Sequence, residues 1–250
     1  LNRSPAALLT GVGALSAVIL FVFKDTITGF ISSIQVSAND LVRVGDWITM
    51  PSLHADGDVE EITINTVKIR NFDKTIVTIP THSLINSGVQ NWRGMTESGG
   101  RRIKRAINID IDSIKFCNDE LFTKISHIDI LSERINTLYL QAKEDNPSSH
   151  SALDNPLNSR QFTNIGLFRY YIENYLKSLP TISQSHMFLI RQLAPNQFGL
   201  PLEIYVFTNN TNWNQYEQIQ ADIFDHLLAA TKTFELKVFQ LDRGLSRIAT

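Results

Sequence analysis

Few residues of this chain have the types and spacing that catalysis or metal binding requires. Two carboxylate pairs stand close in sequence: Asp56 with Asp58 at a predicted turn, and Asp110 with Asp112 on one face of a predicted strand. A lone pair of carboxylates is a poor cation site, because Ca²⁺ takes six to eight oxygen ligands. The six histidines are scattered and form no metal-binding motif. They are His54, His82, His127, His150, His186 and His226.

Motifs for phosphate, dinucleotide or zinc chemistry are also missing: the sequence has no P-loop, GxGxxG, HExxH or CxxC. We therefore expect no cofactor, no metal and no enzymatic activity. The formal net charge of −2 gives no reason to expect a nucleic-acid partner. The basic run Arg101 to Arg105 could bind anionic lipid or nucleic acid, but a solvated edge strand is the favoured interpretation. Cys117 is the single cysteine, which excludes an intrachain disulfide and favours a reducing compartment.

The most unusual stretch is apolar and lies near the start of the chain. Pro5 to Phe23 contains no charged residue, and as a helix it would be roughly 28 Å long, against about 30 Å for the hydrocarbon core of a bilayer. Lys24 and Asp25 follow, and Thr26 to Asn39 is half apolar. We predict a membrane helix, a charged break and an amphipathic helix at the membrane edge. The alternative is a buried helix of a soluble core.

After this helix the apolar residues alternate with a period of two. Leu41 to Pro80 predicts about five short strands, with turns at Gly45-Asp46, Asp56-Gly57 and Asn71 to Lys74, which is typical of a small barrel. A short helix is expected between Thr81 and Gln90, with Leu84 and Ile85 inward, and a linker at Gly94 to Gly100. The predicted barrel core consists of Trp47, Ile62, Val67 and Ile79.

The remaining residues predict an α+β domain of the ferredoxin-like kind, with the order β-α-β-β-α-β. Strands are expected from Ile103 to Ile111, Met187 to Ile190, Leu202 to Phe207 and Glu235 to Gln240. Helices are expected over Asn118 to His127, Ile130 to Lys143, Ile165 to Leu179 and Trp213 to Ala230, with a polar loop from Glu144 to Arg160. The predicted boundaries are residues 1–40 for the membrane and amphipathic helix, 41–98 for the barrel and 99–250 for the α+β domain.

An ordered set of short motifs follows the apolar helix. The set is Val44-Gly45-Asp46-Trp47-Ile48, Gly57-Asp58-Val59 with Ile62, then Thr66, Arg70 and Asp73, Ile79-Pro80, and Asn91-Trp92. Each motif is weak alone, but in this order after a pore-type helix they resemble the small-conductance mechanosensitive channel family of bacteria. Residues after Trp92 resemble the family's α/β carboxy-terminal domain. Asn146 to Tyr170 resembles the enlarged domain of its miniconductance, osmotic-adaptation branch.

The resemblance implies a homoheptamer in the bacterial inner membrane, with the residues after about position 40 in the cytoplasm. The apolar helix would line a central pore, and the barrel and α+β domains would form a hollow cage with side portals. The implied partners are membrane lipids, other copies of the chain, and inorganic ions and small osmolytes as permeants, with no nucleic acid. Further apolar segments are expected before Leu1.

The resemblance also implies roles for residues of the helix. Ala17 and Phe21 fall where the family has two pore-closing leucines, and Ala17 is too small to seal well, which leaves Phe21, alone or with Leu20, as the gate. The implied pore lining is Gly13, Ala14, Ala17, Val18 and Phe21. Lys24 and Asp25 would form the pore mouth. The family's two kink glycines fall at Asp25 and Ser33, so Gly29 is the expected helix break, and Thr81 replaces the usual asparagine after Ile79-Pro80.

These expectations favour a channel subunit that opens under membrane tension and releases ions and solutes after hypo-osmotic shock. One alternative is a membrane-anchored osmotic sensor that signals through its cytoplasmic domain and conducts little. A weaker alternative is a soluble ligand-binding or RNA-binding barrel, since small barrels do bind oligonucleotides. No row of exposed aromatic and basic residues favours that last alternative.

Overall fold

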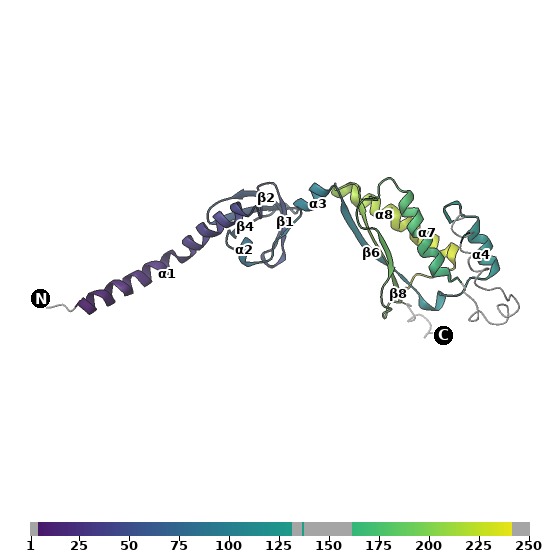
Figure 1. Cartoon of the computed structure of the whole chain (residues 1–250), viewed down its shortest axis with the longest axis horizontal. Coiled ribbons are helices and arrows are strands. Elements are labelled where there is room, and N and C mark those ends of the chain that lie inside the picture. Colours follow the sequence, from purple (N-terminus) through teal and green to yellow (C-terminus); the bar gives the residue numbers. More distant parts are fainter. Residues whose placement is uncertain (1–4, 132–136, 138–161, 242–250) are drawn as a thin grey trace, which may run out of the picture. The chain divides into compact units, whose positions relative to one another are not determined.

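A computed structural model describes residues 5–131, 137 and 162–241 of the chain. The chain forms two compact units, Leu1–Ser98 and Gly99–Thr250, drawn in Figure 1. The first unit begins with α1, a continuous helix of 34 residues, Pro5–Ala38. The predicted break at Lys24-Asp25 and Gly29 is therefore wrong in this structure. The helix continues because neither Lys24 nor Asp25 removes a backbone hydrogen bond, and because a single glycine inside a helix costs only about 1 kcal/mol.

The barrel unit is a five-stranded antiparallel sheet with the strand order β4-β3-β2-β1-β5. Its strands are β1 (Trp47–Met50), β2 (Ala55–Ile62), β3 (Thr66–Asn71), β4 (Ile76–Pro80) and β5 (Gln90–Asn91). A 3-10 turn, η1 (Pro51–Leu53), joins β1 to β2, and the short helices α2 (Ser83–Asn86) and α3 (Arg93–Ser98) precede and follow β5. The predicted linker at Gly94 to Gly100 is thus mostly helical.

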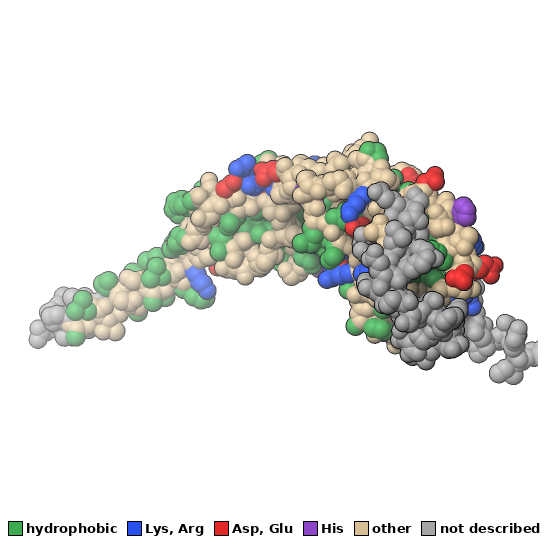
Figure 2. Space-filling model, turned by 45° about the vertical axis from the view of Figure 1, so that its right-hand side comes forward, with side chains coloured by type: hydrophobic (Ala, Val, Ile, Leu, Met, Phe, Trp, Pro, Cys, Tyr) green, Lys and Arg blue, Asp and Glu red, His purple; other side chains and the backbone are tan. Residues whose placement is uncertain are grey.

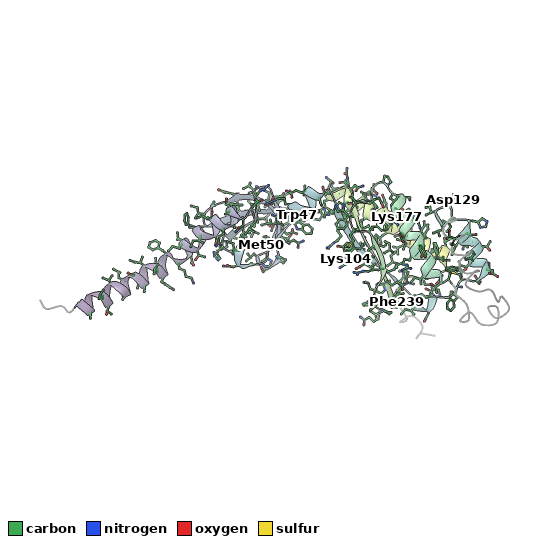
Figure 3. All side chains as sticks on the ribbon, viewed as in Figure 1. Trp47, Met50, Lys104, Asp129, Lys177 and Phe239 are labelled. Atoms are coloured by element: carbon green, nitrogen blue, oxygen red, sulfur yellow. The ribbon has the colours of Figure 1, made fainter. Side chains whose placement is uncertain are left out.

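One apolar core lies inside the sheet and receives side chains from every long element of the unit. Its buried members are Val36, Val42, Ile48, Met50, Ala55, Val59, Val67, Ile69, Ile79 and Leu84. Val67 and Ile79 confirm the predicted core, whereas Ile62 is only half-buried. Trp47 is on the outer face of β1, opposite Ile48 and Met50 (Figure 3). Each face of this strand carries a large apolar residue, Trp47 on one and Ile48 on the other, so alternation alone does not tell which face is buried.

Two other local expectations are wrong. Leu41 to Val44 is a loop rather than a strand. The Asp56-Gly57 pair lies inside β2 rather than at a turn, because strand β3 passes too close for a side chain at position 57. A Cβ there would lie 2.0 Å from the carbonyl oxygen of Arg70. In α2, Leu84 is buried as expected, but Ile85 is exposed.

The burial pattern predicts where truncation destabilises the barrel unit. Ile69→Ala should lower the free energy of unfolding by about 2–5 kcal/mol, because Ile69 is fully buried and truncation leaves a cavity. Ile62→Ala, the same change at a half-buried position, should cost clearly less. Chemical denaturation of the two variants measures the difference. Equal losses, or a larger loss for Ile62→Ala, would contradict the assigned strand faces.

The second unit packs helices on one face of a three-stranded antiparallel sheet with the order β6-β8-β7 (Figure 1). The strands are β6 (Arg101–Ile109), β7 (Leu189–Gln192) and β8 (Leu200–Thr208), and the helices are α4 (Asp119–Ser126), α7 (Asn164–Ser178) and α8 (Trp213–Ala230). Each of these helices begins after a side-chain cap: Asn118, Thr163 and Asn212 accept hydrogen bonds from the backbone of the first turn. The local sequence thus sets the helix starts.

The predicted last strand, Glu235 to Gln240, is reduced to a single bridge between Val238 and Ile109. The chain leaves the 3-10 turn η4 (Thr231–Phe234) through Glu235, whose φ of 55° is left-handed and interrupts an extended run. The predicted helix from Ile130 to Lys143 and the loop from Glu144 to Arg160 lie mostly outside the described residues. The same is true of most of Asn146 to Tyr170, so the assignment to the miniconductance branch stays a prediction.

Candidate pore helix and its anchor

In the upper part of α1, residues 6–27, every side chain whose burial is described is exposed, and Figure 2 shows apolar side chains along the face in view. Phe21 is 80% exposed, the highest value among the large apolar residues that the structure describes. Ala14, Ala17, Val18 and Phe21 share one face, since they are spaced by three and four residues. Gly13 lies about 80° around the helix from Phe21, on the edge of that face. By length and composition, Leu9–Ala38 can cross a membrane.

Lys24 and Asp25 are both exposed on α1, one turn after Phe21. They interrupt the apolar surface of the helix without interrupting the helix itself. Charged side chains at the centre of a bilayer cost several kcal/mol, so in a membrane this pair would lie at the edge of the hydrocarbon or in contact with water.

The lower part of α1 packs on the barrel unit through a narrow stripe of Gly29, Ser32 and Val36, which are buried at helical spacing. Gly29 serves close approach rather than a bend: a Cβ there would lie 2.6 Å from Oδ1 of the Asn65 side chain and 3.4 Å from the Ile64 carbonyl oxygen, both in the β2–β3 turn. Val36 joins the barrel core. Through these contacts the barrel fixes the rotation of α1 about its own axis.

This stripe continues the predicted gate face. Phe21, Asp25, Gly29, Ser32 and Val36 follow one another at intervals of four, four, three and four residues along one unbroken helix. The side of α1 that carries Phe21 is therefore the side that the barrel holds.

A charged cluster ties the end of α1 to the end of the barrel. Asp40, with a left-handed φ of 51°, ends the helix. The Arg93 side chain, at the start of α3, donates to Oδ2 of Asp46 at 2.5 Å and to Oδ2 of Asp40 at 3.0 Å. Asp46 also accepts from the Arg43 backbone N–H and from Asn91 Nδ2, both at 2.8 Å. The cluster joins segments about fifty residues apart at the point where the helix enters the barrel.

Asp46 is the buried centre of this cluster, with 8% of its surface exposed. Burial acts to raise the pKa of its carboxyl, but the Arg93 side chain, the Arg43 backbone N–H and the Asn91 amide outweigh that effect and lower the pKa to about 2. The Asp40 pKa is also lowered, chiefly by its hydrogen bond from Arg43, and the Arg93 pKa is raised by Asp46. Both carboxylates therefore stay ionised at neutral pH.

The Asp46 cluster gives stability a defined pH dependence. Because folding lowers the Asp46 pKa from 3.8 to about 2, the stabilisation is fully present above pH 4 and is lost as the pH falls through 2. The difference is about 2 kcal/mol. In the Asp46→Asn variant, the stability lost between pH 4 and pH 2 should shrink by this amount. Thermal unfolding of both proteins across that range measures it, and parallel curves would refute the assigned pKa.

Sequence reasoning missed Arg93 and Asp40, although Arg93 directly follows the Asn91-Trp92 motif. It also placed Trp47 inside. On the outer surface, Trp47 stacks on Trp92 with ring centroids 4.6 Å apart. Its Nε1 donates to Oδ1 of Asp56 at 2.9 Å, and Trp92 Nε1 donates to the Thr49 hydroxyl at 2.9 Å. The motif tryptophans thus fasten β5 to β1 rather than fill the core.

The predicted carboxylate pairs serve local structure. Asp56 accepts the bonds from Trp47 and Thr49, and Asp110 caps the 3-10 turn η2 (Ile111–Ser113) by accepting from the Asp112 N–H. Within the part of the chain that the structure describes, no three histidine, cysteine or carboxylate side chains converge on a metal position. His226 contacts Tyr171 and Tyr175, and His186 contacts Ser183 and Phe207.

Comparison with known proteins gives a specific match. The family model described as "Mechanosensitive ion channel, beta-domain" matches residues 25–94. The chain is 34% identical over 113 residues to the small-conductance mechanosensitive channel MscMJ of Methanocaldococcus jannaschii, covering 44% of this chain and 31% of the relative. It is 23% identical to the low conductance mechanosensitive channel YnaI of Escherichia coli, covering 89% of this chain and 50% of the relative. The chain spans about a third of the length of the first curated relatives that it matches.

Solved structures agree in fold. The crystal structure of Helicobacter pylori MscS in a closed state superposes with a TM-score of 0.59 at 14% identity, covering 96% of this chain and 74% of that one. The cryo-EM structure of wild-type Arabidopsis thaliana MSL1 gives 0.62 at 14% identity, covering 95% and 65%. The fold thus matches over the apolar helix, the barrel unit and the α+β unit. Residues 25–94 match the beta-domain of mechanosensitive ion channels, and the chain resembles channels of the MscS family in sequence and in fold.

Proposed function

We propose that the chain is a subunit of an ion channel that opens under membrane tension and releases ions and small osmolytes after hypo-osmotic shock. Identical copies, seven in number by the family resemblance, would surround a pore lined by Gly13, Ala14, Ala17, Val18 and Phe21. The barrel and α+β units would lie in the cytoplasm of a bacterial cell, beneath the inner membrane.

One observation carries this proposal: a single helix joins an apolar, membrane-length segment to the barrel without a break. The upper segment exposes large apolar side chains that water disfavours, and a bilayer and neighbouring copies would cover them. The lower segment is held by Gly29, Ser32, Val36 and the charged cluster around Asp46.

Tension would favour the state in which the helices lie further apart, because that state occupies more area in the membrane. Tension shifts the equilibrium between the closed and open states through their difference in membrane area, just as a ligand shifts an equilibrium only through its different affinity for the two states. In the closed state a narrow ring of Phe21 side chains would exclude water and with it ions, without any charge barrier. In the open state the ring widens and becomes wet.

Neutralising the pore-mouth charges tests the position of the pore. Lys24→Gln and Asp25→Asn should change the single-channel conductance or the preference between cations and anions, because charges at a narrow mouth alter the local ion concentration. Folding should change little, since both side chains are exposed. Lys24→Arg and Asp25→Glu keep the charges and serve as matched controls. Currents of unchanged size and selectivity in both neutral variants would place the pore elsewhere.

Solute release from liposomes tests the function itself. Protein-containing liposomes loaded with a small fluorescent dye should release it on hypo-osmotic dilution, while protein-free liposomes of the same composition should retain it. Intact liposomes that retain the dye despite correctly inserted protein would reject conduction. That result would favour the alternative of an osmotic sensor.

A further inference from the structure

The sheet of the α+β unit has one covered face and one open face. Ile103 and Ile107 of β6 and Ile204 of β8 point to the core beneath α7 and α8. Their neighbours along the strands point the opposite way, where no described helix of the unit covers them and only the His186 ring stacks on Phe207 among the described aromatic residues, with ring centroids 5.0 Å apart. The pairing places Lys104 and Leu189 on either side of Tyr205, and Arg102 beside Phe207. Figure 3 labels Lys104 on β6.

This open face is positively charged. Arg102, Lys104 and Arg191 lie on it, with one carboxylate, Glu203, among them. Arg191 donates to Glu203 at 2.7 Å, and Lys104 Nζ lies 4.0 Å from the other oxygen of the same carboxylate. Lys104 and Arg191 thus share one carboxylate and Arg102 adds a third positive charge, which leaves an excess of two positive charges. Met187 and Leu189 add apolar surface, 64% and 38% exposed.

The outer face of α8 has the opposite charge. Its exposed residues include Glu217, Asp222 and Asp225, and Trp213–Ala230 contains no lysine or arginine. None of the three carboxylates forms an ion pair with another described residue; Asp222 accepts only from Gln218, at 2.7 Å, and Glu217 from Gln220, at 3.2 Å. Leu228 lies on the same face and is 41% exposed.

We propose that the open face of the β6-β8-β7 sheet docks on the outer face of α8 of a second copy of this chain. The two surfaces are complementary in charge, and each carries exposed apolar residues between its charges. The open sheet face and the outer face of α8 lie on opposite sides of one α+β unit, so each copy would use one face to bind the next copy and the other face to bind the previous one. Such a head-to-tail contact repeats from copy to copy until a ring closes. The inference rests on the proposed function in one respect, namely that identical copies assemble.

Crosslinking in the assembled, membrane-reconstituted protein tests the contact. The background is Cys117→Ser, although burial already raises the pKa of the Cys117 thiol to about 11 and makes it a poor nucleophile. Leu189→Cys marks the sheet face and Leu228→Cys marks α8. Treated with a short bismaleimide, the double variant should give a ladder of covalent oligomers up to the full ring. Each single variant should stay monomeric on a denaturing gel, and co-expressed single variants should give covalent dimers only.

Reversing the charges of the two surfaces is the second test of the contact. Arg102→Glu with Lys104→Gln removes the positive excess; glutamine is used at 104 because a carboxylate there would face Glu203. Asp222→Lys with Asp225→Lys reverses α8. Either pair should reduce the crosslinked fraction of the Leu189→Cys/Leu228→Cys protein at least tenfold. The four changes together should restore most of it, because the charges again match in reversed order. A merely structural role predicts additive loss instead.

The following results of the crosslinking and assembly experiments would overturn the proposed docking of the sheet face on α8. An intact ring without crosslinks in the double variant, or crosslinks within either single variant, would mean a different contact between copies. Crosslinks to another protein would assign the open face to that partner. These results leave the channel proposal standing. Absence of any ring in native mass measurements would remove the docking mode and the proposed assembly together.

Discussion

Phe21→Ser is expected to give a channel that opens at lower tension than the wild type, or that conducts without applied tension. Keeping one Phe side chain from water is worth about 1.5–3 kcal/mol, and a ring of identical subunits multiplies the effect of each copy. A hydroxyl at this position would instead wet the narrowest part of the pore. Cells that express the variant should grow poorly even without osmotic shock, and tension thresholds in membrane patches measure the change.

Phe23→Ser is the matched control for the gate. Phe23 has the same side chain, lies on the same turn of α1 and is also exposed, at 53% against 80% for Phe21. Two residues along a helix, it points roughly 160° away from Phe21. Its replacement should leave the threshold nearly unchanged. A normally assembled Phe21→Ser channel with a wild-type threshold, or a gain of function in Phe23→Ser alone, would show that the gate lies on another face.

Gly57→Ala is expected to destabilise the barrel unit by about 3 kcal/mol or more, at the upper end of what added core atoms cost. The new Cβ would lie 2.0 Å from the Arg70 carbonyl oxygen and 2.6 Å from the Asn71 Cα. These are backbone atoms of a paired strand, so the clash is relieved only by moving β3. Since β2 and β3 also hold the turn that contacts Gly29, the attachment of α1 should loosen as well.

Gly88→Ala supplies the control for this effect. Gly88 also belongs to the barrel unit, but an added Cβ there would meet no heavy atom within 4 Å. Its stability should match that of the wild type or exceed it slightly, because alanine reduces the freedom of the unfolded chain. Denaturation curves of the two alanine variants provide the measurement. A Gly57→Ala protein as stable as Gly88→Ala would contradict the close pairing of β2 and β3.

The sequence was most informative where several local signals coincide. The length of the apolar stretch, the strands that end at Pro80 and the capped helix from Trp213 to Ala230 follow from composition, proline chemistry and helical spacing. The ordered motifs from Val44 to Trp92 identified the family, although no single motif was specific. Val67 and Ile79 were placed correctly because their strand neighbours are polar.

Predictions failed where tertiary contacts override local preference. Asp56-Gly57 resembles a turn, but Gly57 is required by the approach of a neighbouring strand. Trp47 is the largest residue of its strand and yet lies outside, because its ring stacks on Trp92 more than forty positions away. Asp46 owes its environment to Arg93, which is equally distant. Such partners are set by strand pairing, and alternation along one strand cannot identify them.

Single-channel recording from purified protein in liposome patches tests the central claim most directly. Suction that stretches the patch should produce stepwise currents whose open probability rises with tension, at a threshold that Phe21→Ser lowers and Phe23→Ser preserves. Assembled protein that stays electrically silent up to the tension at which the membrane ruptures would contradict the account.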